Sequence, residues 1–263
     1  MFEFHKDKER YFKQQTDNAK EYVLPFIESV KPLKKDMRVL EVGCAEAGVL
    51  KAFLDKGLTG VGVELIDYRA TLAKEFLKDE IEKGRARIIS KNIYDDSFKD
   101  EFVQGFDLIV LKDVIEHIHN QQRAIIRLKE FLKPDGAIFF GFPPWQMPFG
   151  GHQQICKSKW LSKLPYYHLL PASLYKWILQ MGGESKLNID ELLEVKETGI
   201  SIERFERCVR DAGLIVKKRT YYLINPIYKY KFGLKAKKQN AFVASIPVVR
   251  NYFTTCMYYV VGR

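Results

Sequence analysis

Two absences narrow the class of this protein before any motif is considered. The 263 residues include only four cysteines, and Cys44, Cys156, Cys208 and Cys256 stand far apart without a C-x-x-C pair. This spacing argues against a disulfide framework and against a structural zinc site. No apolar run approaches the roughly 20 residues that cross a bilayer, and charges interrupt the N-terminus where a secretory signal needs an apolar segment. We therefore expect a cytoplasmic protein.

Acidic residues are missing from the C-terminal fifth of the chain. The whole sequence carries 43 Lys and Arg against 33 Asp and Glu, and no acidic residue follows Asp211. The net charge of +10 therefore lies in the last 52 residues, concentrated in 217–219 and 228–238. A solvated basic face is the ordinary interpretation of such a stretch. The functional one is attraction to an anionic substrate, a nucleic acid or a membrane surface, and no stable protein partner is predicted.

What the chain does contain is a regular alternation of apolar strands and helical segments. With 46% apolar and 13% aromatic residues it can bury a substantial core. A helix is expected over 7–30, followed by strands at 37–43, 59–65, 86–93, 106–113 and 137–144 with helices at 49–57, 66–84 and 116–136 between them. After an interruption, a helix from Ser201 to Gly213 and strands at 214–224 and 253–262 complete the pattern.

This alternation specifies βαβ units and a parallel sheet covered on both faces by helices. We expect an α/β fold with a doubly wound, mostly parallel, seven-stranded Rossmann-like sheet. Residues 1–145 and 197–263 would form this domain, and 1–34 its N-terminal helical segment. Residues 146–196 are rich in aromatics and Lys and break the alternation after the fifth strand, so they are expected to form an inserted substrate cap.

The loop after the first strand is the place to look for a ligand, because open parallel sheets bind ligands beyond the carboxyl ends of their strands. There the sequence reads EVGCAEAG, in which Gly43 and Gly48 frame small residues and allow backbone N–H groups to approach a polar ligand. Glu64 lies 21 residues past Gly43, at the end of the second strand, where a carboxylate can accept both hydroxyls of a ribose. Dinucleotides and S-adenosylmethionine are both compatible with these features.

Glu41 and several later segments favour the second cofactor, because together they resemble the class I S-adenosylmethionine-dependent methyltransferases. VLEVGCAEAG resembles the family's motif I, E/D-x-G-x-G-x-G, with Ala45 and Ala47 at the second and third glycines. The resemblance covers most of 35–145 and the last two strands. It implies S-adenosyl-L-methionine as cofactor, bound near Glu41, Gly43, Cys44, Ala45 and Gly48.

Three further segments carry the same resemblance. GVGVEL is similar to the strand with the ribose-binding acid, which gives Glu64 that role and places Leu65 next to the adenine. KNIYDD resembles the adenine-edge motif, usually G-D-A, so Asn92 and Ile93 would border the base. FDLIVLKDVIEHI and LKEFLKPDGAIFFGFPP are similar to the family's F-D-x-V-x-x-x-x-V-L-E-H-V and L-K-P-G-G segments, which place Lys112 and Asp113 beside the methionine part.

The catalytic residues follow from the chemistry of the sulfonium. It already activates the methyl group, so transfer needs chiefly proximity, alignment and a dry pocket. An oxygen nucleophile also needs its proton removed, and His152, His117 and Asp113 are the candidate bases near strand ends. His152 in PFGGHQQ is preferred, although a structural histidine in a Gly-rich turn is equally compatible. The expected activity is methyl transfer to a small-molecule, anionic or glycosyl acceptor at oxygen.

Two alternatives remain open at this point. Asp113, Glu116 and His117 form D-x-x-E-H, which resembles the E-x-x-E-H metal site of RNA 3′-end and ubiquinone-pathway O-methyltransferases; the main interpretation assigns no metal. A non-catalytic S-adenosylmethionine-binding module docking on RNA or membrane is the second alternative, and an NAD-dependent oxidoreductase is less favoured. The cap carries Lys157, Lys159, Lys163 and Lys176 without an acid between Gly150 and Gly183, which suits an anionic, glycosyl or lipid-linked acceptor.

Overall fold

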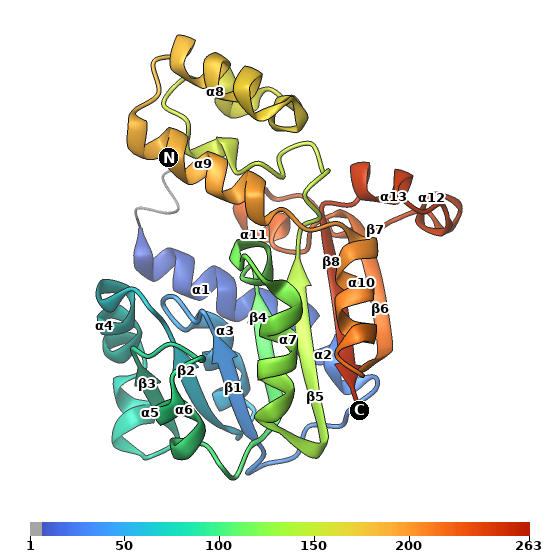
Figure 1. The fold of residues 1–263 in the computed structure, drawn as a ribbon. Helices are drawn as coiled ribbons and strands as arrows, with labels where there is room; N and C mark the ends of the chain where they lie inside the picture. Colours follow the sequence, from blue (N-terminus) through green and yellow to red (C-terminus); the bar gives the residue numbers. More distant parts are fainter. Residues whose placement is uncertain (1–6) are drawn as a thin grey trace.

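A single mixed sheet organises the chain, described here over residues 7–263 by a computed structural model. Its strands lie in the order β3-β2-β1-β4-β5-β8-β6-β7 (Figure 1). Their bounds are β1 Arg38–Val42, β2 Thr59–Val63, β3 Ala86–Ile89, β4 Phe106–Lys112, β5 Leu132–Phe142, β6 Ile215–Ile224, β7 Lys237–Lys238 and β8 Cys256–Gly262. The first five are parallel, whereas β8 pairs antiparallel with both β5 and β6.

The doubly wound, mostly parallel sheet predicted from the sequence is confirmed, with one difference in strand number. The described residues form eight strands, because β7 adds a two-residue edge beside β6. The strand pattern explains the two-sided core. Leu40 and Val42 of β1 face one apolar cluster, and Val39, which precedes them, faces the other. Successive side chains of a strand point to opposite faces, so an almost wholly apolar strand needs cover on both sides.

The N-terminal helix lies next to the loop that follows β1. It runs as α1 Lys8–Asn18, a π-helical turn at Ala19–Val23 and α2 Leu24–Glu28, so the predicted helix is confirmed with a local widening before Pro25. Pro25 lacks an N–H, and a helix that contains a proline is commonly irregular at that point. The first six residues of the expected segment 1–34 lie outside the described residues.

The remaining helices of the sheet domain differ from the predictions in two places, and one helix, over 96–101, was not predicted. They are α3 Gly48–Asp55, α4 Asp67–Phe76, α5 Lys78–Glu82, α6 Asp96–Glu101, α7 Gln121–Glu130 and α10 Ile202–Asp211. The helix predicted over 66–84 is divided at Leu77, and the one predicted over 116–136 is only α7 preceded by a short 3₁₀ turn, η3 Ile115–His117. Asn120 sets the later start, since its Oδ1 accepts the Arg123 N–H at 3.0 Å as an N-cap.

Residues between β5 and α10 build a small helical layer over the carboxyl ends of β4 and β5 (Figure 1). It contains 3₁₀ turns at Gln153–Ile155, Leu161–Lys163 and Tyr167–Leu169, then α8 Ala172–Met181 and α9 Lys186–Thr198. It has an apolar cluster of its own that includes Tyr167 and Tyr175, while Trp160 and Trp177 are exposed. Two of the aromatic residues noted in the sequence are therefore core residues of this layer, and two face solvent.

The segment between β6 and β8 returns to the same end of the molecule. Because β6 is antiparallel to β8 and β8 is antiparallel to β5, β6 ends at the edge where the parallel strands end. From there the chain forms α11 Tyr228–Phe232, β7, α12 Ala241–Ser245 and α13 Val249–Tyr252. The Gln14 side-chain amide donates to the Tyr230 carbonyl at 2.9 Å, and Lys229 pairs with Glu21 at 2.5 Å. These contacts hold α11 against the N-terminal helix.

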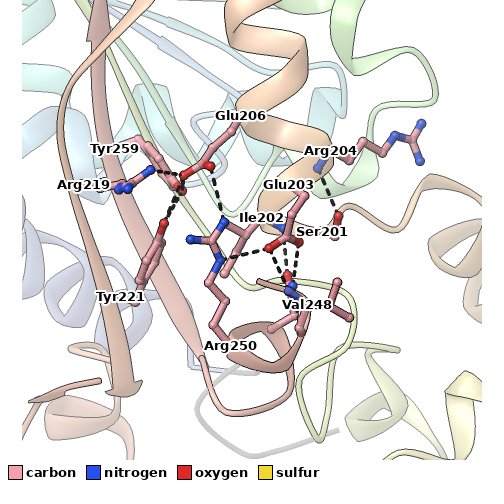
Figure 2. Close-up of polar contacts among 11 residues, drawn as sticks. Ser201, Ile202, Glu203, Arg204, Glu206, Arg219, Tyr221, Val248, Arg250 and Tyr259 are labelled. Carbon is pink, nitrogen blue, oxygen red and sulfur yellow. Dashed lines mark hydrogen bonds and ion pairs between the residues drawn. The ribbon is translucent and has the colours of Figure 1, made fainter. Parts of the chain in front are cut away.

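A polar network fixes α10 to β6, β8 and α13 (Figure 2). Glu206 accepts hydrogen bonds from Arg219 at 2.6 Å and from the Tyr259 hydroxyl at 2.7 Å. Glu203 accepts from Arg250 Nε at 2.9 Å, and the same guanidinium reaches Glu206 through Nη2.

Within residues 7–263, no helix combines the length and the apolar character needed to cross a bilayer.

Candidate active site

A cavity of about 110 Å³ opens at the carboxyl ends of β1 and β4. The loop after β1 and the end of β4 form most of it, and α1 closes it from above. Among the residues expected to bind the cofactor, it is lined by Glu41, Gly43, Cys44, Ala45, Gly48 and Lys112, and Asp113 also lines it. The remaining lining residues are Tyr11, Phe12, Gln15, Glu46, Val49 and Arg69. The structure thus brings the loop predicted from the sequence together with the end of β4.

The backbone of the loop explains its small residues. Gly43 has φ +66°, and a Cβ there would lie 2.6 Å from a methyl carbon of Val114. Ala45 and Ala47, which stand where the resembled motif has glycines, also have positive φ, at 47° and 62°. The left-handed conformation costs an L-residue roughly 1–2 kcal/mol. The loop therefore adopts the backbone conformation typical of glycine, although alanines stand at two positions where the resembled motif has glycines.

Glu64 ties this loop to the end of β2. Its Oε2 accepts the Ala45 N–H at 2.9 Å, and its Oε1 accepts the Ile66 N–H at 3.0 Å. Glu64, Leu65, Asn92 and Ile93 lie outside the lining of the cavity. Leu65 is exposed, Ile93 is buried, and Asn92 uses its Oδ1 to accept the Tyr94 N–H at 3.0 Å. The adenosine contacts assigned to these four residues stay predictions.

A buried carboxyl group, Glu41, and the ion pair of Lys112 with Asp113 dominate the electrostatics of the cavity. Burial raises the pKa of Glu41 to about 8, although its Oε2 accepts the Leu50 N–H at 2.8 Å. Lys112 is buried and bonds to Asp113 Oδ2 at 2.6 Å. Burial alone would raise the pKa of Asp113, but the Lys112 ammonium outweighs it and holds that pKa below its ordinary value. The cavity therefore contains an ion pair and, at neutral pH, a largely protonated Glu41.

Next to this cavity, three potential ligands converge at the end of β4 and after β5. One ligand atom from each of Glu116, His117 and His152 lies within 4.8 Å of the other two. The rings of His117 and His152 meet edge to face, with centroids 4.8 Å apart. Both carboxylate oxygens of Glu116 are buried and lack a hydrogen-bond partner among residues 7–263. Burying both oxygens without a hydrogen bond costs free energy of folding unless a ligand or ion satisfies them.

The protonation states of this cluster follow from its burial. Burial raises the pKa of Glu116 well above its ordinary value, and the nearby Asp113 charge adds to the shift. His152 is half-buried and His117 keeps an exposed surface. Partial removal of water by neighbouring atoms also lowers the pKa of His117, and that of His152 to about 4, with His117 contributing to the second shift. Both imidazoles are therefore neutral near pH 7 and offer a lone pair. Asp113 connects the two regions, since it lines the cavity and acts on the cluster.

Residues from both ends of the chain complete the site and were not identified from the sequence. Tyr11 and Gln15 of α1 line the cavity, and the Lys231 ammonium of α11 lies 5.6 Å from the centre of the Tyr11 ring. The charge of Lys231 helps to lower the pKa of Asp113. The run YKYKF around Lys231 is visible in the sequence as positive charge, but its position against β4 depends on packing between segments more than 100 residues apart.

Comparison with known proteins agrees with this geometry. The family described as "Methyltransferase domain" matches residues 11–181. A ubiquinone biosynthesis O-methyltransferase of Pseudomonas putida is 22% identical over 193 residues, which are 73% of this chain and 71% of that protein. One from Idiomarina loihiensis is 27% identical over 117 residues, which cover 44% of this chain and 46% of the relative.

Solved structures show the same fold at lower sequence identity. The geranyl diphosphate C-methyltransferase of Streptomyces coelicolor, solved with Mg²⁺, geranyl diphosphate and S-adenosyl-L-homocysteine, gives a TM-score of 0.57 at 13% identity, over 94% of this chain and 79% of that one. An S-adenosylmethionine-dependent methyltransferase from Clostridium acetobutylicum gives 0.55 at 12% identity, over 94% and 91%. Since the family match extends over more than half of the residues, the chain belongs to the class I S-adenosylmethionine-dependent methyltransferases.

Proposed function

We propose that this methyltransferase acts on a hydroxyl oxygen of a small acceptor held between the cofactor cavity and the cluster of Glu116, His117 and His152. The observation that carries the proposal is the position of Asp113. It lines the cavity, and its charge helps to raise the pKa of Glu116 in the cluster. An acceptor at the cluster would therefore lie beside the methyl donor. The names of the relatives from Pseudomonas putida and Idiomarina loihiensis, both O-methyltransferases, support oxygen as the accepting atom.

The residues of the cluster suit the proton transfer that such a reaction needs. The hydroxyl oxygen forms a bond to the methyl carbon, and the electrons of the broken carbon–sulfur bond return to sulfur. The hydroxyl proton passes to a neutral imidazole, for which His152 is the candidate because its pKa of about 4 leaves it unprotonated. Lys112 orients Asp113 through their 2.6 Å bond and keeps its carboxylate ionised beside the donor.

A metal-assisted variant of the same reaction is favoured by the unsatisfied oxygens of Glu116. Glu116, His117 and His152 offer one carboxylate and two imidazole ligands, a set suited to Mn²⁺ or another divalent ion. Such an ion would supply Lewis-acid assistance by lowering the pKa of the acceptor hydroxyl. In this variant His117 and His152 would act as ligands, and the proton would pass to another base such as Asp113.

The helical layer over residues 146–196 is proposed to select the acceptor. It covers the strand ends next to the cluster (Figure 1), and Lys157 and Lys159 on it are exposed. Lys231 adds a positive charge beside Tyr11 and close enough to act on Asp113, so an acceptor with a carboxylate, phosphate or similar anionic group is favoured. Acceptor binding should weaken at higher salt and in the Lys157→Glu/Lys159→Glu variant, whereas unchanged binding in both would contradict an anionic acceptor.

The deciding experiment follows the methyl label from S-adenosylmethionine onto a panel of hydroxylated phenols and glycosides, each with and without an anionic group. It is run on metal-depleted protein and again with Mn²⁺ added. His152→Asn should lower transfer at least tenfold, while His119→Asn, which changes an exposed histidine just after η3, should leave transfer unchanged. If Mn²⁺ restores transfer to depleted protein and Glu116→Gln does not respond, the metal-assisted variant is correct.

Two results would contradict the proposal. Transfer to a carbon or nitrogen acceptor with full activity in His152→Asn would move the chemistry away from the cluster. Tight cofactor binding without transfer to any acceptor, together with salt-sensitive binding to RNA or liposomes, would favour the non-catalytic alternative.

A further inference from the structure

The segment between β6 and β8 has a surface that the methyl-transfer reaction does not use. Its helices α12 and α13 project beside the edge strands β6 and β7, at the end of the sheet where the active site opens (Figure 1). Several large apolar side chains of this segment are exposed to solvent. They are Phe232, Leu234, Phe242, Val248, Val249 and Phe253, with Phe242 73% exposed. A group of exposed apolar side chains of this size commonly marks an interaction surface.

The charge of the segment points to the chemistry of its partner. Lys235, Lys237 and Lys238 are exposed beside these apolar side chains, and no acidic residue occurs anywhere after Asp211. Apolar side chains flanked by lysines suit an interface with acyl chains below and anionic headgroups above. Lys229 and Arg250 are excluded from this count because they pair with Glu21 and Glu203.

The apolar side chains are presented by a backbone that is held in place. Glu203 accepts the Val248 N–H at 3.1 Å and the Asn251 side-chain amide at 2.7 Å, and Figure 2 shows the loop fastened to α10 in this way. Val248 has φ +66°, which is unfavourable for a β-branched residue, and its side chain is nevertheless directed into solvent at 59% exposure. Strain of this kind persists where surrounding contacts enforce it, often at functional surfaces.

An anionic membrane fits these observations better than a nucleic acid. Sites for single-stranded nucleic acid stack bases on aromatic rings and use arginine. This surface exposes phenylalanines, but aliphatic residues accompany them at Leu234, Val248 and Val249, and the exposed cations beside them are lysines. We propose that the segment 234–253 docks the protein on an anionic membrane, with Phe242 and Val248 entering the interface and the three lysines contacting lipid phosphates. Because the segment follows α11, whose Lys231 acts on the charge of Asp113, docking would bring the acceptor side of the active site near the lipid surface.

The test is flotation of the full chain with large vesicles of phosphatidylcholine, alone or mixed with phosphatidylglycerol. We expect binding to the mixed vesicles only. Phe242→Ser should weaken it about tenfold, as expected for withdrawing one large apolar side chain from lipid. Lys235→Gln/Lys237→Gln/Lys238→Gln should weaken it by more than tenfold at low salt, since each lysine near an anionic surface contributes about fivefold.

Matched control variants distinguish binding through this surface from nonspecific adsorption to vesicles. Val103→Ser removes an apolar side chain that is 80% exposed before β4, at the opposite end of the sheet, and Lys74→Gln/Lys78→Gln/Lys83→Gln removes three exposed lysines of α4, α5 and the turn after them. Both should bind vesicles like the unaltered protein. S-adenosylhomocysteine titration of every variant checks that the fold is intact, and it reports the cofactor site independently of docking.

Three results would overturn the proposal. The first is no binding to the mixed vesicles by the unaltered protein. The second is vesicle binding that stays unchanged in Phe242→Ser, in the triple lysine variant and in both control variants. The third is tighter binding to a single-stranded RNA oligomer than to the mixed vesicles, which would assign the surface to nucleic acid.

Discussion

Two groups of carboxylates in this protein are built in opposite ways. In the network of Figure 2, all four carboxylate oxygens of Glu203 and Glu206 accept hydrogen bonds, from donors that include Arg250 and Arg219. In the active site, neither oxygen of Glu116 has a partner among residues 7–263, although the side chain is more deeply buried. The first group is arranged for stability. The second retains an unsatisfied polar group, as functional sites often do when a ligand completes them.

Breaking the satisfied network should give the largest loss of stability. Arg250→Met would leave Glu203 and Glu206 without their shared cation, and removing one partner of a buried ion pair costs about 3–5 kcal/mol. We expect about 3 kcal/mol in urea unfolding, since both carboxylates keep some solvent contact. Arg210→Met, at an exposed residue of α10, the helix that carries Glu203 and Glu206, should change the unfolding free energy by less than about 0.5 kcal/mol. A similar small change in Arg250→Met would show that the network is not structural.

A carboxylate that is satisfied and is also predicted to bind the cofactor should combine both behaviours. Glu64 already accepts two backbone N–H groups, and the resemblance gives it the ribose hydroxyls. Glu64→Ala should weaken S-adenosylmethionine binding about 10–100-fold in calorimetric titration, because charge-assisted hydrogen bonds contribute about 1.5–3 kcal/mol. Glu64→Gln keeps one acceptor oxygen and should lose less. Equal affinity for the unaltered protein and Glu64→Ala would remove Glu64 from the cofactor site.

Glu41 should make the stability depend on pH. Burial raises its pKa from the ordinary value to about 8, so between these values the folded chain keeps a proton that the unfolded chain has released. Stability therefore falls as pH rises through this window, by up to about 1.4 kcal/mol per pH unit from this group. Glu41→Gln should flatten the dependence in urea unfolding at pH 5 to 8. An unchanged slope in that variant would show that Glu41 ionises normally in the folded state.

Neutralising the unsatisfied carboxylate should, in contrast to Arg250→Met, cost no stability. Because burial already favours the protonated form of Glu116, Glu116→Gln replaces a group that is held neutral. We expect the free energy of unfolding of metal-depleted protein at pH 7 to stay within about 1 kcal/mol of the unaltered value. If the metal-assisted variant is correct, Mn²⁺ should raise the melting temperature of the unaltered protein and not that of Glu116→Gln. A loss above about 2 kcal/mol would mean that Glu116 has a structural partner.

A small gain in stability is expected where the backbone rather than a charge is strained. Ala45 has φ +47°, and glycine reaches this conformation without a Cβ clash. Ala45→Gly should therefore raise the free energy of unfolding by about 0.5–1 kcal/mol, after the greater unfolded-state entropy of glycine is subtracted. Ala52→Gly, within the regular helix α3, is the matched control and should lower stability by about 1 kcal/mol. A loss of stability in both would show that the loop does not strain Ala45.

The sequence predicted the parts of this site that depend on local patterns. The apolar strand followed by small residues identified the loop from Glu41 to Gly48, and the end of β4 identified Lys112 and Asp113. It also named His117 and His152 as candidates, but not that their rings lie 4.8 Å apart. Tyr11, Gln15 and Lys231 were missed, because a helical or basic segment carries no local signal of the strand against which it will pack. The extra strand β7 was missed for the same reason.

What the sequence by itself determined is the doubly wound sheet and its binding edge. Periodicity of apolar residues decides which segments become strands, and parallel strands connected through helices place their carboxyl ends together. Only the tertiary structure decided which charges would meet at that edge. The burial of the neighbouring pair Lys112 and Asp113 and the isolation of Glu116 depend on how segments far apart in the chain pack around them. Electrostatic energies change steeply with both quantities, and neither can be read from the order of residues.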